Sequence, residues 1–263
     1  MQDSLDAVAL DALRADFPPP QIVDVRRAQT VAAHPVIIPG AVVRDPHGLL
    51  DWATRLEWWR PIVVYCAEGH ERGCDAAATL RACGHKARTL EGGLAAWEAA
   101  GKPMAALRPP TRWVTRERPK IDRIACPWLV RRFIDASAEF HYVPAADVKR
   151  FAAEQGATPY DVADVAYGHV GTQCTFDAFI AHHALGADPA LARLATIVRG
   201  ADTAAHELAA EAAGLLAVSH GLSRMIADDH AMLHGGMLVY DALYLWCRSE
   251  AARGRCTPSR AAA

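Results

Sequence analysis

The sequence lacks several features that would point to particular classes of protein. Its 263 residues carry 28 basic and 30 acidic side chains, so the formal net charge of −2 gives no basic excess for binding a polyanion or a membrane surface. The longest apolar run, residues 231–247, is interrupted by His234 and Asp241 and falls short of a membrane-spanning helix. We therefore expect a globular protein that binds neither nucleic acid nor membranes.

Signals for export and for a zinc ribbon are also missing. The first residues are acidic and amphipathic, without the basic start and apolar core of a secretory signal, which predicts a cytoplasmic protein. The seven cysteines are an odd number and lack the paired spacing of zinc ribbons. In a reducing compartment such cysteines are expected to be free thiols.

The first hundred residues alternate between short apolar runs and amphipathic stretches. The runs at 21–26 and 60–66 have the composition of buried strands. Helical spacing is found in residues 4–15, 49–58, 73–82 and 95–100. This alternation predicts an α/β domain, in which a parallel sheet has helices on both faces. Residues 101–113 contain three prolines and no periodic pattern, which predicts a domain boundary near residue 108.

The composition after this boundary favours helices. Strands are predicted only at 112–116, 139–143 and, less regularly, 161–170. A helix entered through Cys126 would place Pro127 at its first position, where the missing N–H is harmless. The predicted organisation is an α/β domain over 1–106, a linker over 107–112, a mainly helical α+β domain over 113–248 and a flexible tail over 249–263.

The predicted strand at 60–66 ends in a cysteine, Cys66, which a polar segment and then a helix follow. Backbone N–H groups at a helix N-terminus stabilise a thiolate, and Gly69 allows the segment to curl toward an anion. The pattern therefore predicts a nucleophilic cysteine. The alternative is a cysteine packed inertly at a strand end.

Four stretches of the first half resemble the rhodanese family in their order and spacing. They are residues 22–26 (IVDVR), 38–42 (IPGAV), 63–73 (VVYCAEGHERG) and 90–103 (LEGGLAAWEAAGKP). The resemblance implies a rhodanese-type sulfurtransferase that needs no cofactor, with Cys66 carrying sulfane sulfur as a persulfide. A small-molecule sulfur donor such as thiosulfate and a thiophilic acceptor would be its partners. The loop implied to hold the anion consists of Ala67, Glu68, Gly69, His70, Glu71 and Arg72.

The loop is one residue longer than the usual rhodanese loop, because five residues separate Cys66 from Arg72. This spacing resembles the phosphatases and arsenate reductases of the same fold, in which an arginine holds a tetrahedral oxyanion. An alternative function is therefore a thiol-dependent oxyanion reductase or phosphatase. Tyr65 argues against it, because those enzymes usually have histidine at that position.

Three further residues are predicted to support the cysteine loop. Asp24 and Arg26, at the end of the first strand, are expected either to brace the loop as an ion pair or to form a purely structural pair. Cys74 is either a resolving thiol for Cys66 or a small side chain packed against the sheet.

The second half resembles the C-terminal domain of chromate-resistance proteins. The likeness runs in order through residues 112–144, 171–179, 188–202, 211–225 and 240–246. It implies a link to chromate or another oxyanion, without implying a reaction. A third functional alternative is a sensing module, in which this domain binds chromate or a metal and the rhodanese half reports redox state.

Several side chains of the second half are candidate metal ligands. The candidates are His169, Cys174, Asp177, Asp202 and His206. Cys174 with Asp177, and Asp202 with His206, have the spacing that places two side chains on one helix face. Family members often carry histidine where Arg199 stands, and arginine cannot bind a metal, so a family metal site would be incomplete here.

Asp122 and Arg123 precede the predicted helix and are expected to form an ion pair beside Trp128 and Phe133. They are expected to cap and brace that helix. The alternative is that they line an oxyanion pocket under aromatic cover.

Overall fold

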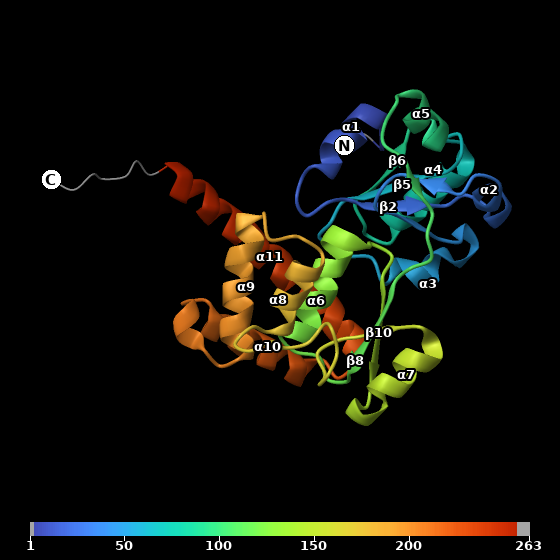
Figure 1. Cartoon of the computed structure of the whole chain (residues 1–263). Helices are drawn as coiled ribbons and strands as arrows, with labels where there is room; N and C mark the ends of the chain where they lie inside the picture. The colour runs from blue at the N-terminus through green and yellow to red at the C-terminus, as the bar shows by residue number, and fades with distance from the viewer. Residues whose placement is uncertain (1–2, 257–263) are drawn as a thin grey trace. The chain divides into compact units, whose positions relative to one another are not determined.

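The computed structural model describes residues 3–256, with side chains described as far as Ala252, and it contains two compact units. The first unit consists of the described residues up to Pro110 together with Asp135–Ser137, and the second of Thr111–Ile134 and the described residues from Ala138 onward (Figure 1). Among residues 3–256, no helix combines the length and the apolar character needed to span a bilayer.

The sheet of the first unit has five parallel strands in the order β1-β6-β5-β2-β4, which confirms the predicted parallel sheet. The strands are β1 (Ser4–Leu5), β2 (Gln21–Asp24), β4 (Ala41–Val43), β5 (Ile62–Tyr65) and β6 (Ala87–Leu90). A separate antiparallel pair joins β3 (Val36–Ile37) to β7 (Ala105–Ala106). The helices are α1 (Ala7–Arg14), α2 (Ala28–Ala33), η1 (Pro46–Gly48), α3 (Leu49–Ala53), α4 (Glu71–Ala82) and α5 (Gly93–Ala99).

Alternate residues along β5 enter two different hydrophobic clusters. Val63 and Tyr65 pack with residues of α1 and α5. Ile62, Val64 and Cys66 pack with residues of α3 and α4. Successive side chains of a strand point to opposite faces, so both faces of the sheet are covered by helices, as predicted.

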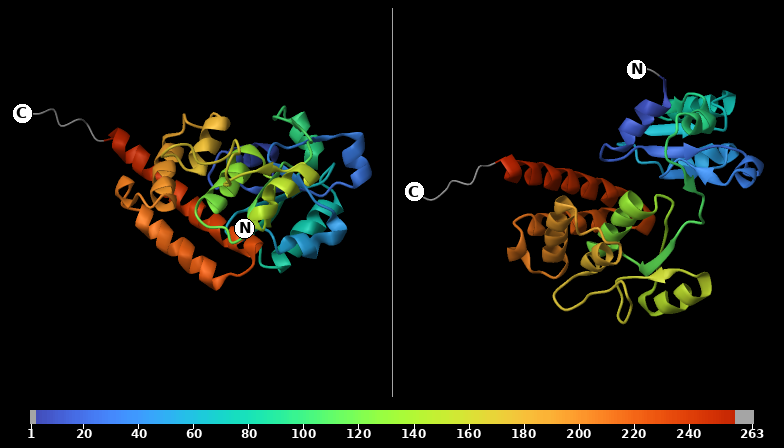
Figure 2. Two further views of the ribbon diagram at one scale, coloured as in Figure 1. Left: turned by 60° about the horizontal axis from the view of Figure 1, so that its bottom comes forward. Right: turned by 45° about the horizontal axis from the view of Figure 1, so that its top comes forward.

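The second unit is mostly helical, as predicted. Its helices are α6 (Asp122–Leu129), η2 (Val130–Ile134, a π-helical turn), η3 (Ala145–Asp147), α7 (Val148–Gln155), α8 (Thr175–His182), α9 (Pro189–Asp202), η4 (His206–Leu208), α10 (Ala212–Met225) and α11 (Asp229–Cys256). A small parallel sheet has the strands β10 (Thr158–Pro159), β8 (Arg112–Arg116) and β9 (Glu139–Val143), in that order. Helices α9 and α10 pack against α11, and Figures 1 and 2 show α10 running beside it.

Helix α6 contains a proline in its interior, so the prediction that the helix starts at Cys126 is wrong. Pro127 cannot donate to the carbonyl oxygen of Arg123, four residues earlier in the helix. The hydroxyl groups of Tyr142 and Tyr160 donate to that oxygen instead, at 3.4 and 3.5 Å. The helix tolerates proline because donors from outside the helix satisfy this carbonyl.

Two other predictions for the second half are wrong. Residues 161–170 form turns rather than a strand, because Asp161 and Asp164 adopt left-handed conformations that interrupt extended backbone. Helix α11 continues through Cys256, past the predicted start of a flexible tail at residue 249, since Ala251 and Ala252 favour helix. The remainder of the predicted tail, 257–263, lies outside the described residues.

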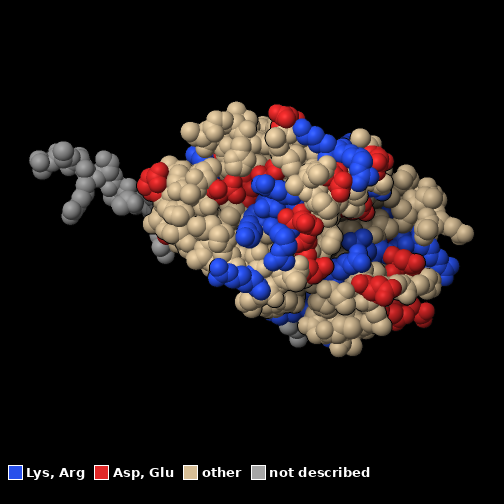
Figure 3. Space-filling model, turned by 90° about the horizontal axis from the view of Figure 1, so that it is seen from below, with Lys and Arg blue, Asp and Glu red and all other residues tan. Residues whose placement is uncertain are grey.

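Basic and acidic side chains lie next to one another on the face shown in Figure 3, and neither sign covers it. This distribution agrees with the nearly balanced composition of the chain.

Candidate functional site

Cys66 follows β5 directly and lies between the loop and the first turn of α4. Its side chain is only 6% exposed. The thiol donates a hydrogen bond to the carbonyl oxygen of His70, with a sulfur–oxygen distance of 3.7 Å. A Cβ atom at Gly73 would lie 3.5 Å from the sulfur, so α4 approaches the thiol closely.

The loop that follows Cys66 has backbone N–H groups without acceptors among the described residues. None of the N–H groups of residues 67–72 donates a hydrogen bond within the part of the chain that the structure describes. The next N–H group, that of Gly73, donates to the carbonyl oxygen of His70 at 3.1 Å. Because free N–H groups at a helix N-terminus attract negative charge, this loop can bind an anion beside the thiol.

Two glycines fix the shape of the loop by close backbone contact. Gly69 and Gly93 have φ values of 73° and 59°, which favour glycine. A Cβ atom on Gly93 would lie 2.4 Å from the carbonyl oxygen of Cys66 and 2.6 Å from the nitrogen of Gly69. The same carbonyl accepts a hydrogen bond from the N–H of Leu94 at 2.9 Å. The Gly-Gly pair at 92–93 is the sequence signal of this contact, although it was not among our predicted site residues.

Asp24 and Arg26 form a buried ion pair with a nitrogen–oxygen distance of 2.7 Å. The Tyr65 hydroxyl donates to Asp24 at 2.9 Å, and the Arg26 guanidinium donates to the carbonyl oxygens of His34 and Val36. Burial and the neighbouring Asp24 carboxylate raise the pKa of Tyr65. These contacts brace β5 and the segment around β3, which favours the structural interpretation of the pair.

The charged residues of the loop are arranged unevenly. Arg72 is half-buried in the first turn of α4 and forms no hydrogen bond or ion pair with residues 3–256. Glu68 pairs with His70 at 3.4 Å, and both side chains are exposed. Arg72 is therefore available to an external anion.

Cys74, the predicted resolving or packed thiol, lies on the exposed side of α4. The interpretation as a side chain packed against the sheet is wrong, because the buried positions of α4 are taken by residues such as Gly73, Ala76 and Leu80. No described contact joins Cys74 to Cys66.

In the second unit, two of the predicted metal ligands are placed elsewhere. Asp177 accepts hydrogen bonds from the Arg199 guanidinium at 2.6 and 2.8 Å and from the Cys174 N–H at 3.0 Å, so it caps α8 and neutralises Arg199. His206 is exposed in η4, and α9 ends at Asp202. Asp202 and His206 therefore do not share a helix face, and that prediction is wrong.

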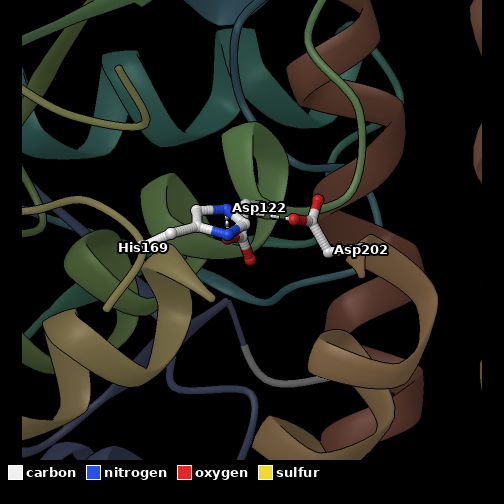
Figure 4. A group of neighbouring side chains, drawn as sticks. All are labelled: Asp122, His169 and Asp202. Atoms are coloured by element: carbon white, nitrogen blue, oxygen red, sulfur yellow. Dashed lines mark ion pairs between the residues drawn. The ribbon is translucent and has the colours of Figure 1, made fainter. Parts of the chain in front are cut away.

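His169 and Asp202, two other predicted ligands, come together with Asp122, which was not predicted as a ligand (Figure 4). The Nε2 atom of His169 lies 3.5 Å from a carboxylate oxygen of Asp122 and 3.2 Å from one of Asp202. Asp161 is 3.4 Å from the same nitrogen. The hydrogen bond with Asp122 and the surrounding carboxylates raise the pKa of His169 to about 9.

Burial gives the carboxylates of this group unusual titration. It raises the pKa of Asp122, and together with the charges of Asp122 and Asp161 it raises that of Asp202 to about 7. Cys174, the fifth predicted ligand, precedes α8 beside Asp122. Burial and the Asp122 carboxylate raise the pKa of the Cys174 thiol, which favours its neutral form.

Asp122 and Arg123 do not pair with each other, contrary to the predicted bracing pair. The Arg123 guanidinium is 3.2 Å from Asp161 and donates to the carbonyl oxygens of Arg116 and Glu117. Asp122 instead accepts a hydrogen bond from the Thr175 N–H at 2.6 Å. Consecutive residues of a helix point about 100° apart, so neighbours in sequence reach different partners.

Comparison with known proteins assigns each half of the chain to a family. The family model for the ChrB C-terminal domain matches residues 113–247, and the model for the rhodanese-like domain matches residues 7–100. Protein ChrB of Cupriavidus metallidurans is 34% identical over 133 residues, which are 51% of this chain and 40% of that protein. The match thus spans less than half the length of this curated relative.

Several solved structures are similar to part of the chain. The Alr3790 protein from Anabaena is 36% identical, with 39% of this chain and 80% of that chain covered and a TM-score of 0.35. Protein SSP1007 from Staphylococcus saprophyticus is 28% identical, with 37% and 93% covered and a TM-score of 0.33. The family models carry the assignment: the chain has a rhodanese-like domain and, through a match to half of its residues, belongs to the family of the ChrB C-terminal domain.

Proposed function

We propose that the chain is a sulfurtransferase that carries sulfane sulfur as a persulfide on Cys66. The observation that supports this most is the loop 67–72, whose N–H groups have no acceptors in the described chain and lie beside a nearly buried thiol. A persulfide is an anion, and such donors stabilise negative charge. The nearly buried position of the thiol also limits access of bulky thiols to the carried sulfur.

The reaction has two steps that balance without a redox cofactor. The Cys66 thiolate attacks the outer sulfur of a donor such as thiosulfate, the sulfur–sulfur bond of the donor breaks, and sulfite leaves with the bonding electrons. A thiophilic acceptor then attacks the outer sulfur of the persulfide, and the Cys66 thiolate is the leaving group. The loop N–H groups stabilise the thiolate and the persulfide in turn.

The second domain supports a role in chromate or oxyanion resistance, because a relative of this domain is named Protein ChrB. We propose that this domain determines which acceptor or oxyanion the protein serves. The six described cysteines are all free thiols, a state that suits the reducing cytoplasm, where we place the protein.

Intact-mass measurement of the full chain tests the proposal. After incubation with thiosulfate and removal of excess donor, we expect a mass gain of one sulfur atom, which is lost on addition of cyanide. Cys66→Ser should show no gain, because oxygen forms no persulfide, whereas Cys74→Ser, at an exposed thiol of the adjacent helix, should behave like the wild type. A wild-type chain that gains no sulfur from thiosulfate or mercaptopyruvate, or a gain that persists in Cys66→Ser, contradicts the proposal.

A second candidate function, binding of a tetrahedral oxyanion by the same loop, is favoured by one observation. Arg72 is half-buried next to the free N–H groups and has no ionic partner in residues 3–256. A guanidinium in that position can hold an oxyanion by charge-assisted hydrogen bonds. Protection of Cys66 from alkylation by phosphate or chromate tests this function, because a bound oxyanion covers the thiol.

A further inference from the structure

Three side chains from distant parts of the second unit converge on one point. Asp122 starts α6, His169 lies in the turns before α8, and Asp202 ends α9. One ligand atom from each lies within 4.8 Å of the other two. Figure 4 shows both carboxylates directed toward the imidazole of His169.

One atom of this group has no partner. Asp122 is fully buried, and its Oδ1 atom forms no hydrogen bond within the described chain. The other oxygen accepts from the Thr175 N–H. A buried carboxylate oxygen without a donor has lost its water without compensation, and a cation bound to the same carboxylate would compensate its charge.

The carboxylate of the nearby Asp161, unlike that of Asp122, has partners for both of its oxygens. It accepts from the Thr175 hydroxyl at 3.0 Å and pairs with Arg116 and Arg123 at 3.3 and 3.2 Å. The two arginines offset the charge of Asp161, whereas the ion pairs that Asp122 and Asp202 form within the described residues are with His169. The group therefore has room for positive charge and repels anions.

We propose that Asp122, His169 and Asp202 bind a divalent first-row transition-metal ion. Metal–ligand bonds of about 2.0–2.2 Å place neighbouring ligand atoms about 3.0–3.6 Å apart. The separations of 3.2 and 3.5 Å between the imidazole nitrogen and the two carboxylates fall in this range. One nitrogen and two oxygen donors suit zinc, cobalt, manganese or iron, whereas magnesium and calcium prefer oxygen alone.

The site has a way in from solvent. The His169 side chain is 43% exposed, and Asp202 is partly exposed. Three protein ligands do not fill the coordination shell of the metal. Because the site is accessible, water or an oxyanion could occupy the remaining coordination positions.

Titration of the metal-free full chain with Co²⁺ and Zn²⁺ tests the site. After treatment with a chelator, we expect one Co²⁺ to bind per chain, with visible absorption typical of a four- or five-coordinate ion, and Zn²⁺ to displace it. Mg²⁺ at the same concentration should not compete. Absence of stoichiometric Co²⁺ and Zn²⁺ binding, or Mg²⁺ binding of equal strength, would overturn the proposal.

Variants separate this site from adventitious binding by surface histidines. His169→Ala and Asp202→Asn, at accessible side chains, should weaken Zn²⁺ binding about 100-fold or more, because loss of a hydrogen-bond partner behind a ligand alone costs about 10–100-fold. Asp122→Asn should do the same, with circular dichroism as the check on folding. His206→Ala is the matched control, an exposed histidine four residues after Asp202, and should bind as the wild type does. Equal affinity in His169→Ala and the wild type, or equal losses in His169→Ala and His206→Ala, refutes the site.

Discussion

The two candidate sites differ in which hydrogen-bonding group lacks a partner among the described residues. The first site has backbone donors without acceptors, and the second has a side-chain acceptor without a donor. In the rhodanese-like domain, the N–H groups of residues 67–72 are donors without acceptors among residues 3–256. In the ChrB-type domain, the Oδ1 atom of Asp122 is an acceptor without a donor in the described chain. The first site lies beside a helix N-terminus, whereas the second has its deepest ligand fully buried.

This difference indicates the charge of the ligand at each site. Donors without partners gain most from an anion, and a buried carboxylate without a partner gains most from a cation. The thiol of the first site, Cys66, suits the proposed sulfur transfer, and the ligand atoms of the second site suit the proposed metal ion. The predictions below alter one kind of group at a time.

The largest effect is expected from Gly93→Ala, which changes the shape of the donor loop without removing any donor. The new Cβ atom would meet the Cys66 carbonyl oxygen and the Gly69 nitrogen at 2.4 and 2.6 Å, so the backbone must move apart. We expect a loss of more than about 2 kcal/mol in the free energy of unfolding and a strong loss of sulfur transfer. Urea unfolding and a thiosulfate–cyanide assay measure both.

Gly101→Ala is the matched control for that variant. Gly101 has a φ of 64°, close to that of Gly93, but nothing lies within 4 Å of its added Cβ atom. Its free energy of unfolding should fall only by the roughly 1–2 kcal/mol that a left-handed conformation costs a residue with a Cβ atom, and its activity should be kept. Similar losses in both variants would show that conformation, rather than contact with the loop, makes Gly93 important.

Arg72→Ala removes the side-chain donor at the anion site and leaves the backbone donors in place. If the longer loop admits an oxyanion, this change should weaken protection of Cys66 by phosphate or chromate about tenfold, the value of a charge-assisted hydrogen bond of about 1.5–3 kcal/mol. The repulsion from Glu68 and Glu71 keeps the expected loss near the lower limit. Peptide mass mapping of alkylated Cys66 measures it. Equal protection in both proteins rules out binding of the oxyanion by Arg72 and, with it, the second candidate function.

Tyr160→Phe removes one hydrogen-bond donor from a backbone acceptor in the ChrB-type domain. The carbonyl oxygen of Arg123 loses one of its two hydroxyl donors, which should cost about 1 kcal/mol in the free energy of unfolding. The same change in a Pro127→Ala background should cost less, because the alanine in that variant supplies the helical N–H that proline lacks. A double-mutant cycle in urea measures the difference, and equal costs in both backgrounds would show that the tyrosine does not replace the missing donor.

The smallest effect is expected from His141, whose buried Nε2 atom has no partner in the described chain. Burial lowers its pKa below the usual 6.5, and the charges of Arg112 and His230 act in the same direction against the opposing Glu139. As the pH falls through about 6.5, the unfolded chain takes up this proton first, so stability decreases. Between pH 7.5 and pH 5, the Tm of His141→Gln should therefore fall by less than the Tm of the wild type. An unchanged pH dependence would assign the acid sensitivity to other groups.

The first domain could be predicted from sequence in more detail than the second. Its sheet and both helix layers follow from local apolar runs, and Cys66 stands at the end of one of them. The Gly69–Gly93 contact joins residues 24 positions apart, so the Gly-Gly pair at 92–93 marks a special backbone position without showing what it contacts. Asp202 and His169 were predicted as ligands, but Asp122 was not.

The reason lies in how ligand pairs are sought in a sequence. Helical spacing grouped Cys174 with Asp177 and Asp202 with His206, whereas the structure takes one residue from each of three segments. Asp177 is neutralised by Arg199, and that pairing depends on the packing of α8 against α9. The start of α6 was predicted wrongly at Pro127, because the tyrosines that compensate for the missing N–H of this proline come from other elements.

The alternation of side chains along β5 limits how insertions and deletions can accumulate near the thiol. Ile62, Val64 and Cys66 face one side of the sheet, and Val63 and Tyr65 the other. One residue gained or lost within β5 would send the cysteine to the opposite side, away from α4 and its N-terminus. One residue gained after Cys66 leaves the strand in register and only widens the loop. Descendants of this sequence can therefore vary in loop length and in the anion they hold, while the strand before the cysteine keeps its length.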